Sequence, residues 1–395
     1  MKAEDEDVGV KEKLVFLTGA TGYLGCHLAY GLLQRGSRVM ALVRGDEEET
    51  AVSRLQSAIL QVNPTAPPDF SRLVVVLGDV EETAVSLINK VRDQASQPID
   101  EVWHCVATFK YQEQERNYIQ AINIGGVKNI LGFVRGVNLA EPPRYFHVST
   151  AYSSGRDCLV VPEAIVSNGS DTGFRSLYEW SKHEGEKVVA QAQHRYQLDV
   201  TILRPAIIIG SETTQVFNHS AYYQVISALY RVRRHLENRQ KNFDGTINTR
   251  LVGDPQTTLN LVPVDYVVNT MLQLAQQPEL ATPLLKIFNI VNEEPPTMGL
   301  VHQVLCETLA IRGLTLVPLA QFDMAEASRV ERALARNVAF QMPYMHEEIR
   351  FSTANLRQVL PFTTWPAPQV DARFLTAINR EFFGMLAERM ENGRF

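Results

Sequence analysis

Short apolar runs alternate with amphipathic segments through much of the chain. Each run is brief enough for a buried strand of a parallel sheet. The segments between them, such as 26–36 and 124–136, carry apolar residues at helical spacing. This alternation predicts an α/β fold with a Rossmann-type, doubly wound parallel sheet. The expected strands are residues 14–18, 38–44, 72–80, 101–108, 144–150, 199–205 and 285–291.

The regular alternation fades after residue 205, where the chain becomes mainly helical with loops rich in Pro, Asn and Gly. We expect these later segments to form a smaller, mainly helical substrate-binding region over the edge of the sheet where ligands bind. The expected NADP-binding Rossmann domain is 13–205 plus about 258–292, and the expected substrate-binding region is 206–257 plus 293–395.

Composition and charge narrow the classes of function. The 395 residues are 45% hydrophobic and 21% charged, with a net charge of −6, which argues against nucleic acid as a partner. Four scattered cysteines without a CxxC pair predict no metal site and a reducing, cytoplasmic location. We find no signal peptide and no apolar stretch long enough to be transmembrane. Residues 1–12 are highly charged and predict a flexible tail.

Three glycines spaced three apart follow the first apolar run: Gly19, Gly22 and Gly25. They predict a turn from a strand into a helix with little side-chain bulk. The N–H groups at such a helix N-terminus, together with the helix dipole, favour an anion such as a pyrophosphate. A tight turn without a ligand is the alternative interpretation of this motif on its own.

The residue after the second strand indicates which dinucleotide is bound. NAD sites usually place Asp or Glu there, whereas this chain has Arg44, whose guanidinium suits a ribose 2′-phosphate. Arg54 would add a second positive charge, so we expect NADPH. The alternative for Arg44 is a solvated strand end paired with the acidic residues that follow it. Asp79, after the third strand, is either an acceptor for the adenine amino group or a turn carboxylate.

A Tyr and a Lys four residues apart carry the expected chemistry. On a helix, Tyr178 and Lys182 lie on one face, about one turn apart. An ammonium close to a phenol lowers the phenol pKa, and a hydroxyl from Thr150 can hold a substrate oxygen. Ser149 and Thr150 end the fifth strand, at the edge where a cofactor lies. This set suits hydride transfer to or from a carbonyl with proton transfer at its oxygen.

The order of these motifs resembles the extended short-chain dehydrogenase/reductase family. The matching segments are TGATGYLG, GDV, NIGGVKNIL, VST, YEWSK and LRPAIIIG, within residues 14–210. The resemblance implies that Thr150, Tyr178 and Lys182 are catalytic, that Lys182 also binds the nicotinamide ribose, and that Asn123 supports the lysine. The cofactor site then expected comprises Gly19, Thr21, Gly22, Tyr23, Leu24, Gly25, Arg44, Arg54, Asp79, Val80, Val106, Ala107, Ser149, Tyr178, Lys182, Pro205 and Ile208.

Within that family, ALVRG…SRL, VWHCVAT and STAYSSG are most similar to the thioester reductases, which include fatty acyl-CoA reductases and the reductase domains of carboxylic acid reductases. The resemblance implies NADPH-dependent reduction of an acyl thioester, bound to CoA or to an acyl carrier protein, to an aldehyde or on to the alcohol. It weakens beyond residue 210. The basic segment 229–241 either meets the phosphates of such a substrate or is a solvated helix face.

Two other functions remain open from the sequence. An enzyme of the same fold can act on a nucleotide sugar or a hydroxysteroid-like substrate as an epimerase, dehydratase or dehydrogenase. A non-catalytic NADPH-sensing protein can also use this fold, although such a protein does not need the Tyr and the Lys. The sequence predicts no oligomeric state.

Overall fold

The computed structural model describes residues 12–156, 158, 160–166, 173–211, 222–240, 242–280 and 284–391. Apart from residue 12, the expected tail lies outside the described residues. So do residues 212–221 of the expected substrate-binding region.

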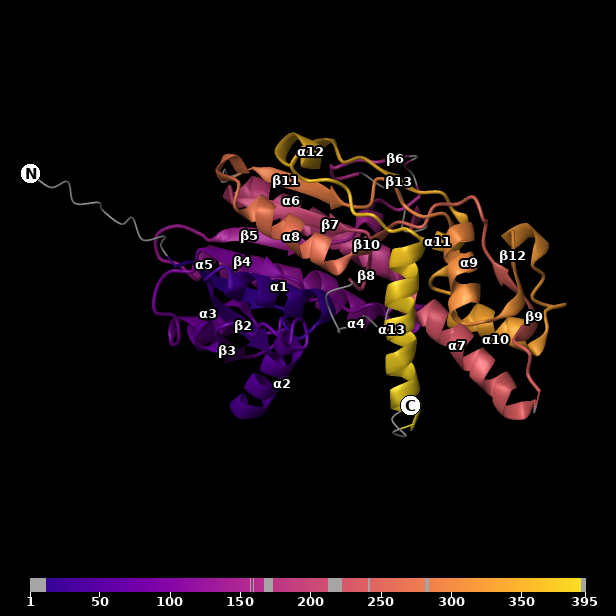
Figure 1. The fold of residues 1–395 in the computed structure, drawn as a ribbon. Helices are drawn as coiled ribbons and strands as arrows, with labels where there is room; N and C mark the ends of the chain where they lie inside the picture. The colour runs from indigo at the N-terminus through magenta and orange to yellow at the C-terminus, as the bar shows by residue number, and fades with distance from the viewer. Residues whose placement is uncertain are drawn as a thin grey trace, which may run out of the picture.

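A seven-stranded, all-parallel sheet forms the centre of the molecule and confirms the predicted doubly wound α/β fold (Figure 1). The strand order is β11-β7-β5-β4-β1-β2-β3. Because the order reverses between β1 and β4, the carboxyl ends of these strands meet at a topological switch point, where such sheets bind ligands. The strands are β1 (Leu14–Thr18), β2 (Arg38–Val43), β3 (Leu73–Leu77), β4 (Glu101–His104), β5 (Arg144–Val148), β7 (Val200–Pro205) and β11 (Leu285–Ile290).

Helices cover both faces of this sheet and enclose two hydrophobic cores. Along β1, Val15 and Leu17 point into one core and Leu14 and Phe16 into the other, as the two-residue period of a strand requires. The first core is shared with α1 (Tyr23–Gln34), α2 (Glu48–Leu60) and α8 (Val264–Ala275). The second is shared with α3 (Ala84–Arg92), α5 (Gly126–Gly136) and α6 (Leu177–Tyr196).

The described chain beyond β7 also contains short strands, one of which pairs with a strand before β7, and this differs from the expectation of a mainly helical region. Three two-stranded parallel ladders pair β8 with β10, β9 with β12 and β6 with β13. Residues of β9 alternate between buried and more exposed positions over its first half, the pattern of a half-buried strand. These strands are β6 (Val160–Val161), β8 (Ile207–Ile209), β9 (Thr246–Val252), β10 (Leu261–Pro263), β12 (Arg312–Val317) and β13 (Arg350–Phe351).

The remaining helices gather mostly on the right of Figure 1, where α13 runs down beside α7 and α9. They are α4 (Arg116–Gln120), α7 (Tyr222–Arg239), α9 (Met298–Thr308), α10 (Arg329–Asn337), α11 (Met342–His346), α12 (Ala354–Val359) and α13 (Ala372–Glu391). One π-helical turn, η3 (Ala121–Gly125), joins α4 to α5. Short 3₁₀ turns are η1 (Phe70–Arg72), η2 (Glu113–Glu115), η4 (Ala151–Ser154), η6 (Pro278–Leu280) and η7 (Leu319–Gln321).

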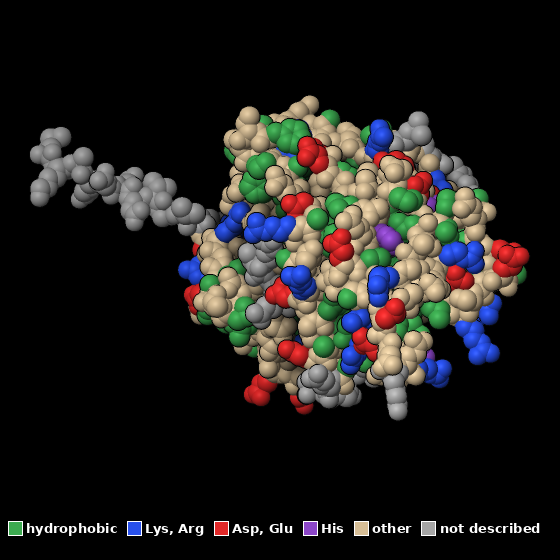
Figure 2. All heavy atoms as spheres, turned by 45° about the vertical axis from the view of Figure 1, so that its right-hand side comes forward, with side chains coloured by type: hydrophobic (Ala, Val, Ile, Leu, Met, Phe, Trp, Pro, Cys, Tyr) green, Lys and Arg blue, Asp and Glu red, His purple; other side chains and the backbone are tan. Residues whose placement is uncertain are grey.

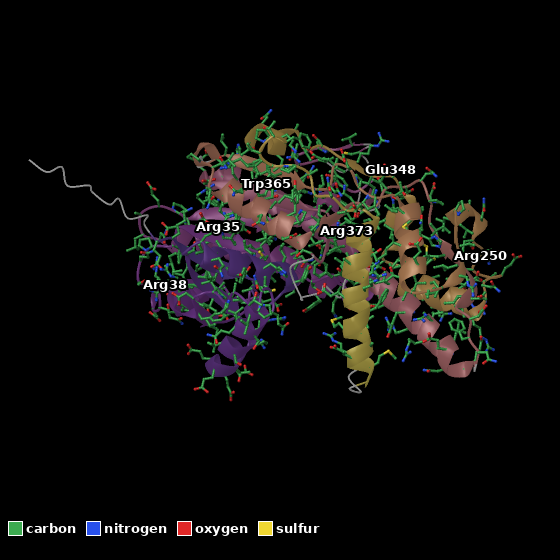
Figure 3. All side chains as sticks on the ribbon, viewed as in Figure 1. Arg35, Arg38, Arg250, Glu348, Trp365 and Arg373 are labelled. Atoms are coloured by element: carbon green, nitrogen blue, oxygen red, sulfur yellow. The ribbon has the colours of Figure 1, made fainter. Side chains whose placement is uncertain are left out.

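Polar contacts link this later region to the sheet domain and also link its own segments to one another. The indole of Trp365 donates to the Thr270 hydroxyl on α8 over 2.9 Å, while Arg250 pairs with Glu331 at 2.7 Å near the far end of the molecule (Figure 3). The buried Tyr222 hydroxyl donates to Asn379 over 2.9 Å and so joins α7 to α13. These contacts link the late segments to α8 and to one another.

Charges of both signs are scattered over the face in Figure 2. Across the described ranges, no helix combines the length and the apolar character needed to cross a membrane. No cluster of three or more His, Cys, Asp or Glu side chains is placed to hold a metal ion within that same part of the chain.

Candidate active site

A cavity of about 560 Å³ opens at the carboxyl ends of the central strands. It is bounded on one side by the glycine turn and on the other by segments from α7, α9 and α11. The predicted site residues that line it are Gly19, Thr21, Gly22, Tyr23, Leu24, Gly25, Arg44, Asp79, Val80, Val106, Ala107, Ser149, Thr150, Tyr178, Lys182, Pro205 and Ile208. Arg54 and Asn123 are outside this lining.

The glycine turn has a backbone that side chains would obstruct. Gly19 has a φ of +77° and accepts a hydrogen bond from the Gly22 N–H over 2.9 Å. A Cβ atom on Gly25 would lie 2.0 Å from the Gly19 carbonyl oxygen. Gly22 is the N-cap of α1 and provides no side-chain cap, so the helix N-terminus keeps N–H groups for an anion. A pyrophosphate fits this cradle.

The end of β2 places one arginine at the cavity and a second behind it. The Arg44 side chain is 74% exposed, and its Nε lies 3.7 Å from an Asp79 carboxylate oxygen. The Arg54 guanidinium donates to the Arg44 carbonyl oxygen. Asp79 also accepts from the Glu81 N–H over 3.0 Å, as in a turn. Arg44 and Asp79 therefore face the same part of the cavity, while Arg54 supports the strand end.

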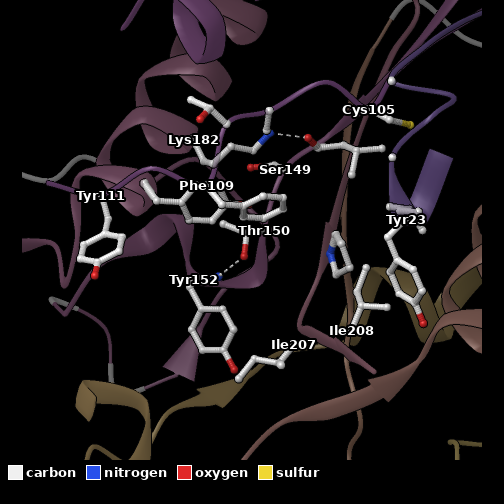
Figure 4. Close-up of a pocket in the computed structure, with 18 of the residues that line it drawn as sticks. Tyr23, Cys105, Phe109, Tyr111, Ser149, Thr150, Tyr152, Lys182, Ile207 and Ile208 are labelled. Atoms are coloured by element: carbon white, nitrogen blue, oxygen red, sulfur yellow. Dashed lines mark hydrogen bonds between the residues drawn. The ribbon is translucent and has the colours of Figure 1, made fainter. Parts of the chain in front are cut away.

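Helix α6 carries both Tyr178 and Lys182 to the cavity. The Ser176 hydroxyl caps its N-terminus by accepting from the Glu179 N–H over 3.2 Å. Lys182 is 3% exposed, and its ammonium donates to the Val148 carbonyl over 2.6 Å (Figure 4). Burial lowers the pKa of Lys182 to about 8. This lysine is thus held in place at the end of β5.

Tyr178 is surrounded by aromatic rings. Its ring stacks on Phe109 with centroids 5.1 Å apart and meets Phe340 edge-on at 6.4 Å. Burial raises the pKa of the Tyr178 phenol, and the nearby Glu179 carboxylate raises it further. The pKa of this phenol is therefore raised, whereas the sequence analysis expected the Lys182 ammonium to lower it; that ammonium donates to the Val148 carbonyl. At neutral pH the phenol carries its proton.

Thr150 lies where β5 ends and η4 begins. It is 7% exposed, and its hydroxyl accepts weakly from the Tyr152 N–H over 3.4 Å. In Figure 4, Phe109 and Tyr111 lie to one side of Thr150, and Tyr23 and Ile208 to the other. No acceptor for the Thr150 hydroxyl proton lies among the described residues, so this proton can be donated to a group that enters the cavity.

Asn123 lies in the π-helical turn η3, behind the cavity lining. Its amide accepts from the Thr108 N–H over 2.8 Å and donates to the Thr108 carbonyl and the Ser181 hydroxyl at 3.1 and 2.8 Å. Ser181 is the neighbour of Lys182 on α6. Any support that Asn123 gives the lysine therefore passes through the loop after β4 and through α6.

Several lining residues come from the expected substrate-binding region, in which the sequence analysis named no individual site residue. Phe340, Gln341 and Tyr344 approach from the α10–α11 segment, and one face of α9 contributes Met298, Val301 and Leu305. The Tyr344 hydroxyl donates to buried Glu179 over 2.6 Å, which ties α11 to the helix that carries Tyr178. The aromatic residues around Phe340 are the sequence signal for this contact, but they do not indicate which part of the fold they pack against.

Comparisons with known proteins identify the family of this chain. Residues 17–271 match the family described as male sterility protein, an NAD-binding family. The L-2-aminoadipate reductase large subunit of Eremothecium gossypii is 30% identical over 273 residues, which are 64% of this chain and 18% of that protein. Fatty acyl-CoA reductase 1 of Gallus gallus is 30% identical over 149 residues, 36% of this chain and 28% of that protein.

A solved structure shares the fold along nearly the whole chain. The terminal R domain from the myxalamid PKS-NRPS biosynthetic pathway superposes with a TM-score of 0.74 at 22% identity, covering 97% of this chain and 93% of that one. By contrast, this chain spans about a fifth of the length of the aminoadipate reductase. Because the family match covers well over half of the chain, the protein belongs to the male sterility protein family of NAD(P)-binding, extended short-chain dehydrogenase/reductases, among which thioester reductases are its relatives.

Proposed function

We propose that this protein is an NADPH-dependent reductase that converts an acyl thioester to an aldehyde. The observation that carries the proposal is one continuous cavity that brings the glycine turn, Arg44, Thr150, Tyr178 and Lys182 together. The two curated relatives named above are reductases, and their names specify an aminoadipate and a fatty acyl-CoA. The donor is acyl-CoA or an acyl group on a carrier protein, and the product is the aldehyde or, after a second round, the alcohol.

The residues present fit a phosphorylated dinucleotide. The Gly19–Gly25 turn leaves no room for a Cβ at Gly25, and the N–H groups at the start of α1 would bind the pyrophosphate. Arg44 provides a guanidinium to a 2′-phosphate, and Asp79 an acceptor to the adenine. Lys182 would donate to the nicotinamide ribose. Asn123 and Arg54 act on this site through the Thr108 and Arg44 backbones.

The side chains at the end of β5 and on α6 supply the proton chemistry. A bound reduced nicotinamide supplies the hydride that forms a C–H bond at the thioester carbon. Thr150 and Tyr178 donate hydrogen bonds to the thioester oxygen. The Tyr178 O–H bond breaks as its proton passes to that oxygen, which leaves a hemithioacetal. The raised pKa of Tyr178 keeps this proton available at neutral pH.

Collapse of the hemithioacetal completes the reduction. Its hydroxyl proton returns to the Tyr178 oxygen, the C=O bond re-forms, and the C–S bond breaks. The thiolate leaves and takes a proton from water. In balance, one thioester, one reduced dinucleotide and one proton give one aldehyde, one thiol and one oxidised dinucleotide.

The two parts of the chain have separate tasks in this proposal. Residues 13–205 with about 258–292 hold the dinucleotide, and residues 206–257 with 293–395 hold the acyl group. The scattered cysteines and ordinary composition suit an enzyme of the reducing cytosol.

Loss of reduced-nicotinamide absorbance tests the function directly. Purified protein is incubated with NADPH and a panel of acyl-CoAs, carrier-bound acyl groups and aldehydes. We expect oxidation of NADPH that depends on the thioester and yields free thiol in equal amount. No oxidation with any thioester, or tightly retained NAD in the purified protein, would instead favour the epimerase or sensor alternatives.

A further inference from the structure

The cavity has a second wall, and this wall differs chemically from the first. It is built by β8, α7, α9 and the α10–α11 segment, which all lie outside the large sheet. We call this surface the distal wall and define it by Ile207, Val225, Val301, Leu305, Phe340 and Met345. Six buried or partly buried apolar side chains thus face the space next to the proposed reaction centre.

Within the described residues, the charged side chains that line the cavity all lie on its other side. Among the described lining residues, the charged ones are Arg44, Asp79 and Lys182, all at strand ends or on α6. On the distal side the lining residues within the described ranges are uncharged. The side-chain amides on the distal side belong to Gln224 and Gln341, and the Gln341 amide N–H donates to the Gln224 side-chain oxygen. A carboxylate or ammonium on a ligand would therefore meet no ion-pair partner among these residues.

One face of α9 forms part of this wall with helical regularity. Met298, Val301 and Leu305 line the cavity at positions i, i+3 and i+7, and each is at most 2% exposed. Thr297 caps the helix by accepting from the Leu300 N–H over 3.2 Å. This capped helix packs against α13, and its three side chains bound the cavity on that side.

We infer that the distal wall selects an uncharged, apolar acyl group and that Val301 and Leu305 limit its length. This inference rests on the proposed thioester reduction and specifies its substrate class. Burial of an apolar group here stabilises the bound state, whereas an unpaired charge would lose its hydration without compensation. Val301 and Leu305 determine specificity in this account and take no part in the chemistry.

A matched pair of substrates tests the charge selection. Hexanoyl-CoA and adipoyl-CoA have the same number of acyl carbons and differ in a terminal methyl group or carboxylate. We expect kcat/KM for hexanoyl-CoA to exceed that for adipoyl-CoA by on the order of 100-fold or more, because the adipoyl carboxylate would be buried unpaired. Equal values for the two, or a preference for adipoyl-CoA, would overturn the inference.

Two substitutions with opposite effects test the length limit. Val301→Phe shortens the space, so kcat/KM for dodecanoyl-CoA should fall about tenfold or more while that for butyryl-CoA is kept. Leu305→Ala lengthens the space and should raise the ratio of dodecanoyl- to butyryl-CoA reduction. Gln303→Phe, at an exposed position of the same helix, is the matched control and should leave both values unchanged.

The outcomes separate this inference from the proposed function. If butyryl-CoA is reduced by every variant but the chain-length ratio does not move, the length limit is wrong and the reductase stands. If no thioester is reduced by the unaltered protein, the proposed function itself fails. Circular dichroism and dinucleotide binding show whether Val301→Phe is folded, and Leu305→Ala supplies the opposite test if it is not.

Discussion

The two walls of the cavity are built in different ways. The wall at the sheet edge is made by turns that follow successive parallel strands, and it holds the glycines, Arg44, Asp79 and Lys182. The distal wall is made by segments far apart in the chain: Gln224, next to Val225, and Gln341, next to Phe340, are 117 residues apart and hydrogen-bonded. The first wall therefore recognises a fixed polar cofactor with backbone and charge. In our proposal the second wall contacts the acyl group with apolar side chains, and the following predictions test that division.

Removal of the Tyr178 hydroxyl should give the largest effect. We expect Tyr178→Phe to lower kcat by about 10²- to 10⁴-fold, because the proton donor at the thioester oxygen is lost. Dinucleotide affinity should change little, as measured by the fluorescence of bound NADPH. Tyr30→Phe, which removes a hydroxyl that donates to the Ala66 carbonyl on the surface of α1, is the control. Full activity of Tyr178→Phe would contradict the proposed chemistry.

A single methyl group at the glycine turn should abolish cofactor binding. The Cβ of Gly25→Ala would lie 2.0 Å from the Gly19 carbonyl oxygen, so the turn must shift. We expect the NADPH affinity to fall about 100-fold or more, since a displacement of about 1 Å can cost that much at a positioned site. Gly384→Ala, on the exposed side of α13 with no atom within 4 Å, should leave the affinity unchanged in the same titration.

Arg44 should determine the choice between the two dinucleotides. In Arg44→Ala, the KM for NADPH should rise about 10- to 100-fold while that for NADH stays nearly constant, because a charge-assisted hydrogen bond to the 2′-phosphate is lost. Arg54→Ala should have a smaller effect, since Arg54 bonds the Arg44 carbonyl behind the cavity. An equal loss with both cofactors would show that Arg44 does not contact the 2′-phosphate.

The smallest expected effect is the pH dependence of activity, which should involve Lys182. Its pKa of about 8 implies that the ammonium is lost as the pH rises through that value, so kcat/KM for NADPH should fall several-fold per unit above pH 8. Lys182→Arg keeps its charge in this range and should lack that break. A profile of the unaltered enzyme that stays flat up to pH 10 would contradict this role.

Stability should change in the opposite direction over the same window. The folded pKa of Lys182 lies below the unfolded value, so the unfolded chain binds more protons between about pH 8 and 10.4. The free energy of unfolding should therefore rise with pH there, on the order of 1 kcal/mol per unit, relative to Lys182→Met. Urea unfolding at pH 7.5 and pH 9.5 measures this difference.

The same two walls explain how far the sequence could be interpreted. The strands, the glycine turn and the Tyr178–Lys182 pair are local patterns, so their place in the chain was enough to predict the fold and to propose the cofactor side. The distal wall is positioned by contacts between residues far apart in the chain, such as Tyr344 with Glu179 across 165 residues. No local sequence pattern predicts such a contact. The β9 and β12 strands were missed because each is stabilised by its distant partner.

Transfer of deuterium from the cofactor tests the central claim most directly. The protein is incubated with NADPH deuterated at both C4 positions and hexanoyl-CoA, and the product is analysed by mass spectrometry. The account predicts hexanal or hexanol deuterated at C1, released with an equal amount of CoA, and its near-complete loss in Tyr178→Phe. Unlabelled product, or equal labelling by Tyr178→Phe, would contradict it.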